Sequence, residues 1–252
     1  MSAAATLLAV AHGTRDPQGV RTVHALLDKV RRTRPGLRVR VAWLDLVEPS
    51  VPHALAELRG PAVAVPLLLA SGYHVRSDLP TVLADATPTQ VRVAPALGPS
   101  PLLARALAAR LSEAGRPVGG APVVLAAAGS SDPRARADTA ESARLLAAHL
   151  NAPVTAAFAV GEGPSPAEAV AAWRSAGHPD VALATHLLAP GHFARHLTGT
   201  GARWTAAPLG AQRWVAELVL RRYDEGVRGR SSGSSARPAL RSALRSAPPA
   251  RA

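Results

Sequence analysis

Two histidines and one aspartate in the first third of the chain could bind a metal ion or move a proton. His12 follows the apolar run Thr6–Ala11, Asp45 ends a second run in AWLDLVEPS, and His74 follows a third in PLLLASGYHVRSDLP. If these runs are parallel strands, their carboxyl ends meet at one edge of a sheet, which is where ligands bind. Imidazole favours cobalt, nickel, iron or zinc over magnesium. We therefore predict a site for a divalent transition metal, with His12 and His74 as metal-binding residues.

Each of these residues also has an alternative interpretation. His12 is equally typical of a histidine that hydrogen-bonds the following turn. A phosphatase-type Arg-His-Gly motif is a weaker alternative, because residue 11 is alanine. Glu48 could take the role of Asp45, although its position at a helix start favours a capping carboxylate. Gly72 lies two residues before His74 and gives the backbone at this strand end more conformational freedom.

Short apolar runs alternate with longer helical patterns, which is typical of βα units and a parallel sheet. The predicted strands are Thr6–Ala11, Arg38–Leu44, Ala62–Leu69, Gln90–Ala94, Val123–Ala127, Val154–Ala159, Val181–Leu187 and Arg203–Ala206. The predicted helices are Pro17–Arg34, Val51–Leu58, Asp78–Ala86, Pro101–Ala114, Pro133–Leu150, Pro166–Ala176, His192–Leu197 and Ala211–Tyr223. We predict an α/β fold of two tandem flavodoxin-like or Rossmann-like open parallel sheets flanked by helices.

The chain is internally duplicated. HGTRDP at 12–17 matches AGSSDP at 128–133, WLDLVEPS at 43–50 matches FAVGEGPS at 158–165, and LLLASGYHVR at 67–76 matches HLLAPGHFAR at 186–195. Ala128, Val160 and Phe193 stand where the first copy has His12, Asp45 and His74. We therefore predict an active first domain at 1–115, a degenerate repeat at 122–226 that shapes the cleft, and a disordered basic tail at 227–252.

Composition excludes several classes of site. The 252 residues include no cysteine, so disulfides, thiolate metal sites and cysteine nucleophiles are ruled out. The net charge of +12 raises nucleic acid as a partner, but six arginines lie in the segment from residue 227 onward and interleaved aromatic residues are lacking. The motifs G-x-G-x-x-G and G-K-[ST] are absent. We expect a cytoplasmic protein with no nucleic-acid or membrane partner, as a monomer or homodimer.

The three motifs HGTRDP, WLDLVEPS and PLLLASGYHVRSDLP together resemble the single-subunit (class II) sirohydrochlorin chelatases, in their long duplicated form. The resemblance covers roughly residues 6–224. It implies a lyase-type enzyme that inserts cobalt for cobalamin, or iron for siroheme, into sirohydrochlorin without ATP or an organic cofactor, and nickel is a third candidate metal. His12 and His74 match the family's metal-binding and catalytic histidines. Asp45 stands where the family commonly has glutamate, and its shorter side chain leaves open whether it is a ligand or a proton acceptor.

Several other residues beside the motifs could hold the tetrapyrrole. The guanidinium group of arginine can form paired hydrogen bonds with acetate and propionate groups. Tyrosine can stack on a macrocycle, and glycine permits a tight turn. The predicted substrate-binding residues are Arg15, Gly72, Tyr73, Arg76, His192 and Arg195. The alternative is that these arginines are ordinary surface residues and that the Tyr73 ring packs in the hydrophobic core. His186, His192 and His196 form a second cluster, which is either a spare metal site or, as we favour, a set of polar residues lining the pocket. The rival function is a non-catalytic metal or tetrapyrrole carrier on the same fold.

Overall fold

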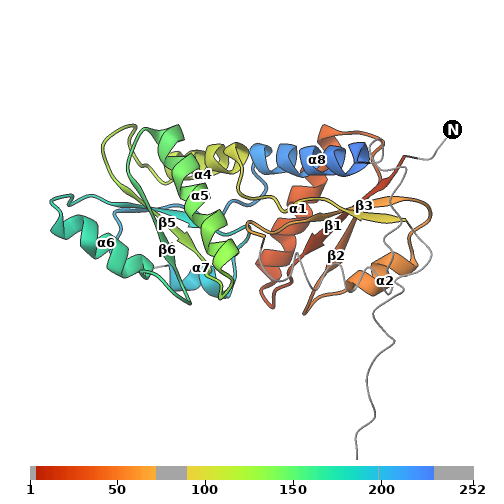
Figure 1. The fold of residues 1–252 in the computed structure, drawn as a ribbon, viewed down its shortest axis with the longest axis horizontal. Coiled ribbons are helices and arrows are strands. Elements are labelled where there is room, and N and C mark those ends of the chain that lie inside the picture. The colour runs from red at the N-terminus through yellow and green to blue at the C-terminus, as the bar shows by residue number, and fades with distance from the viewer. Residues whose placement is uncertain (1–3, 72–89, 198, 230–252) are drawn as a thin grey trace, which may run out of the picture.

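The computed structural model describes residues 4–71, 90–197 and 199–229 as two parallel sheets lying side by side (Figure 1). The strands of the first half are β1 (Thr6–Ala11), β2 (Val39–Trp43), β3 (Ala62–Pro66) and β4 (Val91–Val93), and its helices are α1 (Pro17–Thr33), α2 (Val51–Ala56) and α4 (Pro101–Glu113). The second half has β5 (Val123–Ala127), β6 (Val154–Phe158), β7 (Ala182–His186) and β8 (Trp204–Thr205), with α5 (Pro133–Leu150), α6 (Pro166–Ser175), α7 (His192–His196) and α8 (Arg213–Arg228).

Both sheets have the same topology. The strand orders are β2-β1-β3-β4 and β6-β5-β7-β8, and every pairing is parallel. Strand order reverses beside β1 and β5, so each sheet has a switch point at the carboxyl end of its central strand. The predicted fold class and the predicted duplication are therefore confirmed.

Local sequence explains where the main helices begin. Asp16 accepts the Gln18 N–H at 2.9 Å and is followed by proline, so α1 starts with a capped first turn. Asp132 caps α5 in the same way, through the Arg134 N–H at 2.9 Å. These equivalent caps follow equivalent strands, so the same Asp-Pro pair opens the equivalent helix in each copy.

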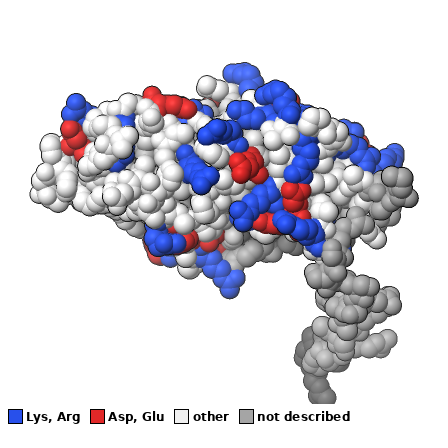
Figure 2. Space-filling view, turned by 90° about the horizontal axis from the view of Figure 1, so that it is seen from above, with Lys and Arg blue, Asp and Glu red and all other residues white. Residues whose placement is uncertain are grey.

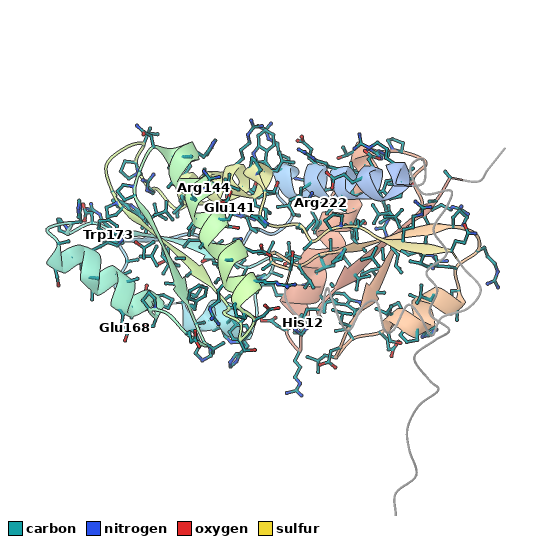
Figure 3. All side chains as sticks on the ribbon, in the orientation of Figure 1. His12, Glu141, Arg144, Glu168, Trp173 and Arg222 are labelled. Atoms are coloured by element: carbon teal, nitrogen blue, oxygen red, sulfur yellow. The ribbon has the colours of Figure 1, made fainter. Side chains whose placement is uncertain are left out.

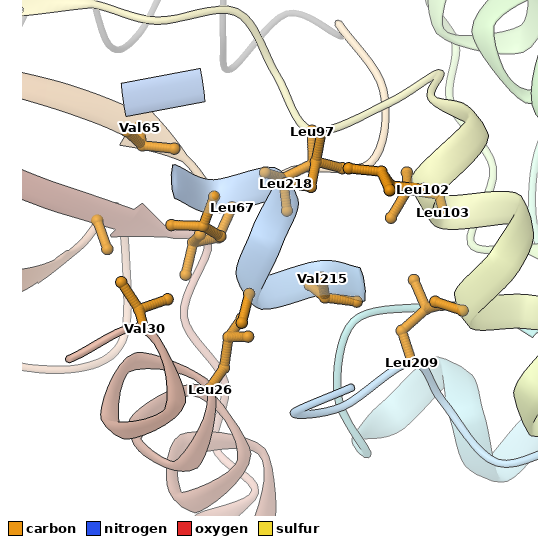
Figure 4. Close-up of a cluster of buried hydrophobic side chains, with 14 of the residues drawn as sticks. Leu26, Val30, Val65, Leu67, Leu97, Leu102, Leu103, Leu209, Val215 and Leu218 are labelled. Carbon is orange, nitrogen blue, oxygen red and sulfur yellow. The ribbon is translucent and has the colours of Figure 1, made fainter. Parts of the chain in front are cut away.

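One hydrophobic core runs through both halves. Leu26 and Val30 from α1, Val65 from β3, Leu103 from α4 and Leu218 from α8 belong to a single buried cluster (Figure 4). Burying each such side chain contributes roughly 1.5–3 kcal/mol. A shared core of this kind makes the folding of the two halves interdependent.

The last helix of each half packs against the other half. α8 contacts α1 and β3, whereas α4 contacts α5 and β7 (Figure 1). The Tyr223 hydroxyl of α8 donates to the Ala5 carbonyl at 2.6 Å, and Asp224 accepts two hydrogen bonds from Arg34 at 2.6 and 2.8 Å. The arginine holds the pKa of the Asp224 carboxyl below its ordinary value. No pattern in the sequence predicted this exchange of helices, and the boundaries 1–115 and 122–226 remain a prediction.

The predicted start of the C-terminal tail is wrong, and other predicted segments lie outside the described residues. α8 continues through Arg228, with Gly229 as its C-cap, so the segment expected as a tail from residue 227 begins inside a helix. The predicted helix Asp78–Ala86 and the remainder of the predicted tail lie outside the described residues. Among the helices of residues 4–71, 90–197 and 199–229, none combines the length and the hydrophobicity that a membrane span requires. Figure 2 shows basic and acidic side chains interspersed on one face of the molecule. Ion pairs also form along α8, where Arg222 lies 2.9 Å from the Glu225 carboxylate.

Candidate active site

A cavity of about 1000 Å³ lies between the two halves, at the carboxyl ends of the central strands. Its walls come from the loops after β1 and β5, the first turns of α1 and α5, and the segment 186–195. Small-molecule sites span roughly 300–1000 Å³, so this cavity can take a large ligand. The switch points of both sheets thus open into the same space.

The loop between β1 and α1 places His12 on the wall of this cavity. His12 is exposed, and Figure 3 shows it at the lower centre, where the two halves approach each other. Its backbone carbonyl accepts the Asp45 N–H at 3.0 Å. Gly13 has a φ of 110°, and the Thr14 hydroxyl accepts the Asp16 N–H at 3.0 Å. These bonds hold the loop in the conformation that directs His12 outward from the sheet edge.

Asp45 does not line the cavity, although its neighbour Leu46 does. The Asp45 carboxylate accepts the Leu46 N–H at 2.8 Å, and Leu46 has a φ of 64°. The carboxylate therefore supports a left-handed turn that presents an exposed leucine to the ligand space. Glu48 accepts the Ser50 N–H at 2.7 Å, which lowers the pKa of its carboxyl. It acts as the capping carboxylate that its position indicated.

Three further predicted residues line the same cavity as His12. They are Arg15, His192 and Arg195. Arg195 donates to the Asp16 carboxylate at 2.9 Å, which joins α7 of the second half to the start of α1 in the first. Of the remaining predicted site residues, Gly72, Tyr73, His74 and Arg76 lie outside the described residues, so their roles stay predictions.

The described residues do not form a metal site by themselves. Within 4–71, 90–197 and 199–229, no three His, Asp or Glu side chains are grouped so as to hold a metal ion. The alternative that His186, His192 and His196 form a spare metal site is therefore not supported. The rings of His192 and His196 lie 4.4 Å apart at their centroids, and His196 Nδ1 lies 2.8 Å from the His192 carbonyl oxygen.

The second half reproduces the backbone of the first-half site without its histidine. Val160 N donates to the Ala128 carbonyl at 3.0 Å, as Asp45 N does to His12, and Asp132 N donates to Ser130 Oγ at 3.1 Å. Gly129 has a φ of 100°, like Gly13. The geometry therefore agrees with the alignment of Ala128 with His12 and of Val160 with Asp45.

Sequence reasoning missed part of the polar wall in the second half. Arg136 and Thr139 of α5 line the cavity and were not predicted there. His186 at the end of β7 also borders the cavity, as was favoured for it in the sequence. Arg136 pairs with Glu162 at 2.8 Å. His186 is buried, and loss of hydration lowers its pKa to about 4. The internal alignment could have found Arg136 and Thr139, because each replaces an apolar residue of the first copy.

Comparison with known sequences places both halves in one family. The CbiX family model matches residues 6–114 and 122–226. The sirohydrochlorin cobaltochelatase of Methanococcoides burtonii is 32% identical over 87 residues, which cover 33% of this chain and 66% of that protein. The enzyme of the same name from Methanosarcina acetivorans is 32% identical over 81 residues, covering 31% and 62%. The chain thus spans just under two thirds of the length of these relatives.

Solved structures share the whole two-sheet architecture. SirB from Bacillus subtilis with Fe³⁺ superposes with a TM-score of 0.75 at 22% identity, covering 92% of this chain and 98% of that one. A CbiX structure described as the terminal enzyme for siroheme biosynthesis in denitrifying bacteria has a TM-score of 0.65 at 24% identity, covering 87% and 98%. These likenesses support the fold. Because the family model matches residues 6–114 and 122–226, which make up most of the chain, the chain belongs to the CbiX family.

Proposed function

We propose that the protein is a sirohydrochlorin chelatase, which inserts Co²⁺ or Fe²⁺ into sirohydrochlorin without ATP. The observation that carries this proposal is the position of His12, on the wall of a cavity of about 1000 Å³ between two halves that both match the CbiX family. The names of the Methanococcoides and Methanosarcina relatives support the substrate and favour cobalt. SirB has been solved with both Fe³⁺ and cobalt, which keeps iron as the second candidate.

In this proposal the metal is a substrate, handled by His12 together with His74. Insertion exchanges two pyrrole N–H protons for one divalent ion, so the reaction needs a weakly held metal and a nearby proton acceptor. Imidazole can serve in either role. The loop bonds around His12 restrict its position, and a fixed geometry lowers the entropy lost on reaching the transition state.

The cavity walls suit an anionic macrocycle. Arg15 and Arg195 offer cationic groups at the rim, and guanidinium binds carboxylates by paired hydrogen bonds. Leu46 and Phe193 are 52% and 36% exposed on the same walls, so they offer apolar surface to the ring. We propose that the arginines hold the peripheral carboxylates while these two side chains contact the macrocycle.

The test is an anaerobic absorbance assay of sirohydrochlorin with Co²⁺ or Fe²⁺ over many equivalents of substrate. We expect multiple turnovers for the wild type and a loss of about 10²-fold or more for His12→Ala, in the range of acid–base catalysis. His74→Ala tests the second predicted histidine. His149→Ala is the matched control, because His149 is exposed in the last turn of α5 and does not line the cavity.

A carrier on the same fold is the second candidate, and turnover separates it from the enzyme. A carrier would yield no more metallated product than one equivalent per chain. Absence of acceleration with both metals would contradict the chelatase, and a faster reaction with one metal would identify the preferred ion. Full activity in His12→Ala would leave the reaction in place but remove His12 from it.

A further inference from the structure

The cavity wall is built from pairs of positions that the internal duplication relates. Three such pairs are Trp43 with Phe158, Val23 with Thr139, and Leu67 with His186. The strand registers support the last pair. Val10 lies opposite Pro66, the residue before Leu67, and Ala126 lies opposite Thr185, the residue before His186. Leu67 and His186 thus occupy the same place in the two sheets.

Polar and apolar side chains occupy different positions on the cavity wall in the two copies. The first half has His12 at the rim, while Val23 and Leu67 line its inner wall. The second half has Ala128 at the rim, with the polar residues Thr139 and His186 at the inner positions. The second copy has therefore lost the rim histidine but carries polar groups where the first copy is apolar.

His186 lies in this wall at a cost to folding. Its side chain is 3% exposed, and Nε2 has no hydrogen-bond partner among the described residues. A buried polar atom left without a partner destabilises a fold by about 1–3 kcal/mol. Leucine occupies the equivalent site in the first copy, so the fold does not need a histidine there. Trp43 Nε1 is likewise buried without a partner among the described residues, and it borders the same cavity.

An imidazole at this place can reach a ligand. Loss of hydration keeps the pKa of His186 near 4, so at neutral pH the ring is uncharged and has one N–H donor and one lone pair. The torsion that joins the ring to Cβ has a broad, roughly two-fold profile. Rotation of the ring exchanges the edges that carry Nδ1 and Nε2, so the nitrogen that faces the cavity can change when a ligand binds.

We propose that His186 is a substrate-binding residue, whose imidazole hydrogen-bonds a polar atom of the tetrapyrrole in the cavity. In this arrangement the inner wall of the second half helps to hold the macrocycle while the first half handles the metal at His12. The inference rests on the proposed function, because it takes sirohydrochlorin as the ligand. It assigns a specific ligand contact to His186, which the sequence had indicated only as a polar residue of the pocket wall.

The test measures binding and stability separately in two variants of neighbouring residues. His186→Leu installs the residue of the first copy, and Thr185→Val is the control, because Thr185 is buried on the same strand, donates to the Ala206 carbonyl at 2.6 Å and does not line the cavity. Sirohydrochlorin without metal is titrated against each full-length protein, and thermal midpoints are measured without ligand.

We expect His186→Leu to weaken binding at least about tenfold while its thermal midpoint stays equal or rises. Thr185→Val should lower the midpoint and leave binding unchanged. His186→Gln, which keeps a donor and an acceptor, should restore part of the affinity. Binding by His186→Leu within twofold of the wild type would overturn the inference while the proposed function stands. Absence of binding by the wild type would instead overturn the proposed function, and this inference with it.

Discussion

Gly13 lies against the main-chain carbonyl oxygen of Asp45. A Cβ atom at Gly13 would meet that oxygen at 1.8 Å, and the φ of 110° is one that side chains rarely adopt. Gly129 has the same relationship to Val160, with a Cβ distance of 1.8 Å and a φ of 100°. The close approach of two loops at the edge of each sheet therefore requires glycine twice, once beside His12 and once beside Ala128.

Gly13→Ala should damage activity more than its twin substitution does. The strained backbone costs about 1–3 kcal/mol in either loop, and the clash forces the loop to shift. Both loops line the cavity, but only the first carries His12, so we expect turnover to fall at least tenfold further in Gly13→Ala than in Gly129→Ala. Thermal midpoints should drop in both. Equal turnover in the two variants would contradict a site centred on His12.

Asp45 should act through the turn it supports. Asparagine at this position keeps an oxygen that can accept the Leu46 N–H, whereas alanine loses it. We expect Asp45→Asn to retain most of its turnover and Asp45→Ala to show a higher KM, because Leu46 leaves the cavity wall. If Asp45 is instead the proton acceptor or a metal ligand, Asp45→Asn will lose kcat as severely as Asp45→Ala. Steady-state kinetics of the two variants separates these roles.

Burial of His186 predicts a loss of stability in mild acid. The pKa of His186 is about 4 in the folded chain and about 6.5 when unfolded. As the pH falls from 6.5 to 4, the unfolded chain gains a proton that the folded chain does not bind, so the free energy of unfolding decreases. The decrease from this residue approaches about 3 kcal/mol at the lower limit. Urea unfolding at pH 7, 6 and 5 should show it in the wild type, and His186→Leu should have a shallower pH dependence.

The exchanged helix α8 should be needed for the first half to fold. A chain ending at residue 212 lacks the helix that contacts α1 and β3. Its removal exposes the buried side chains of Leu26 and Val30, so we expect aggregation or a non-cooperative thermal transition. Tyr223→Phe is a milder test, because it removes only the hydrogen bond to the Ala5 carbonyl. It should lower the free energy of unfolding by about 0.5–1.5 kcal/mol. A cooperative, monomeric 1–212 chain would show that each half is self-contained.

Local signals in the sequence were enough for most of the fold. The strands Thr6–Ala11 and Val123–Ala127 and the helix Pro133–Leu150 have the predicted bounds, because apolar runs, N-caps and first-turn prolines act over a few residues. The duplicated motifs likewise predicted two equivalent sheets. The exchange of α4 and α8 was not predictable in this way, because both helices are amphipathic whichever sheet they cover.

The sequence by itself determined the βα order, the duplication and the position of His12 after the central strand, since each depends on residues close together in the chain. Only the tertiary structure decided which side chains share the cavity. It turns Asp45 toward the Leu46 N–H, and it brings Arg195 to Asp16 at 2.9 Å. It also leaves His186 buried in the opposite wall. These outcomes depend on backbone torsions and on packing between segments more than a hundred residues apart, which no local pattern of residue types records.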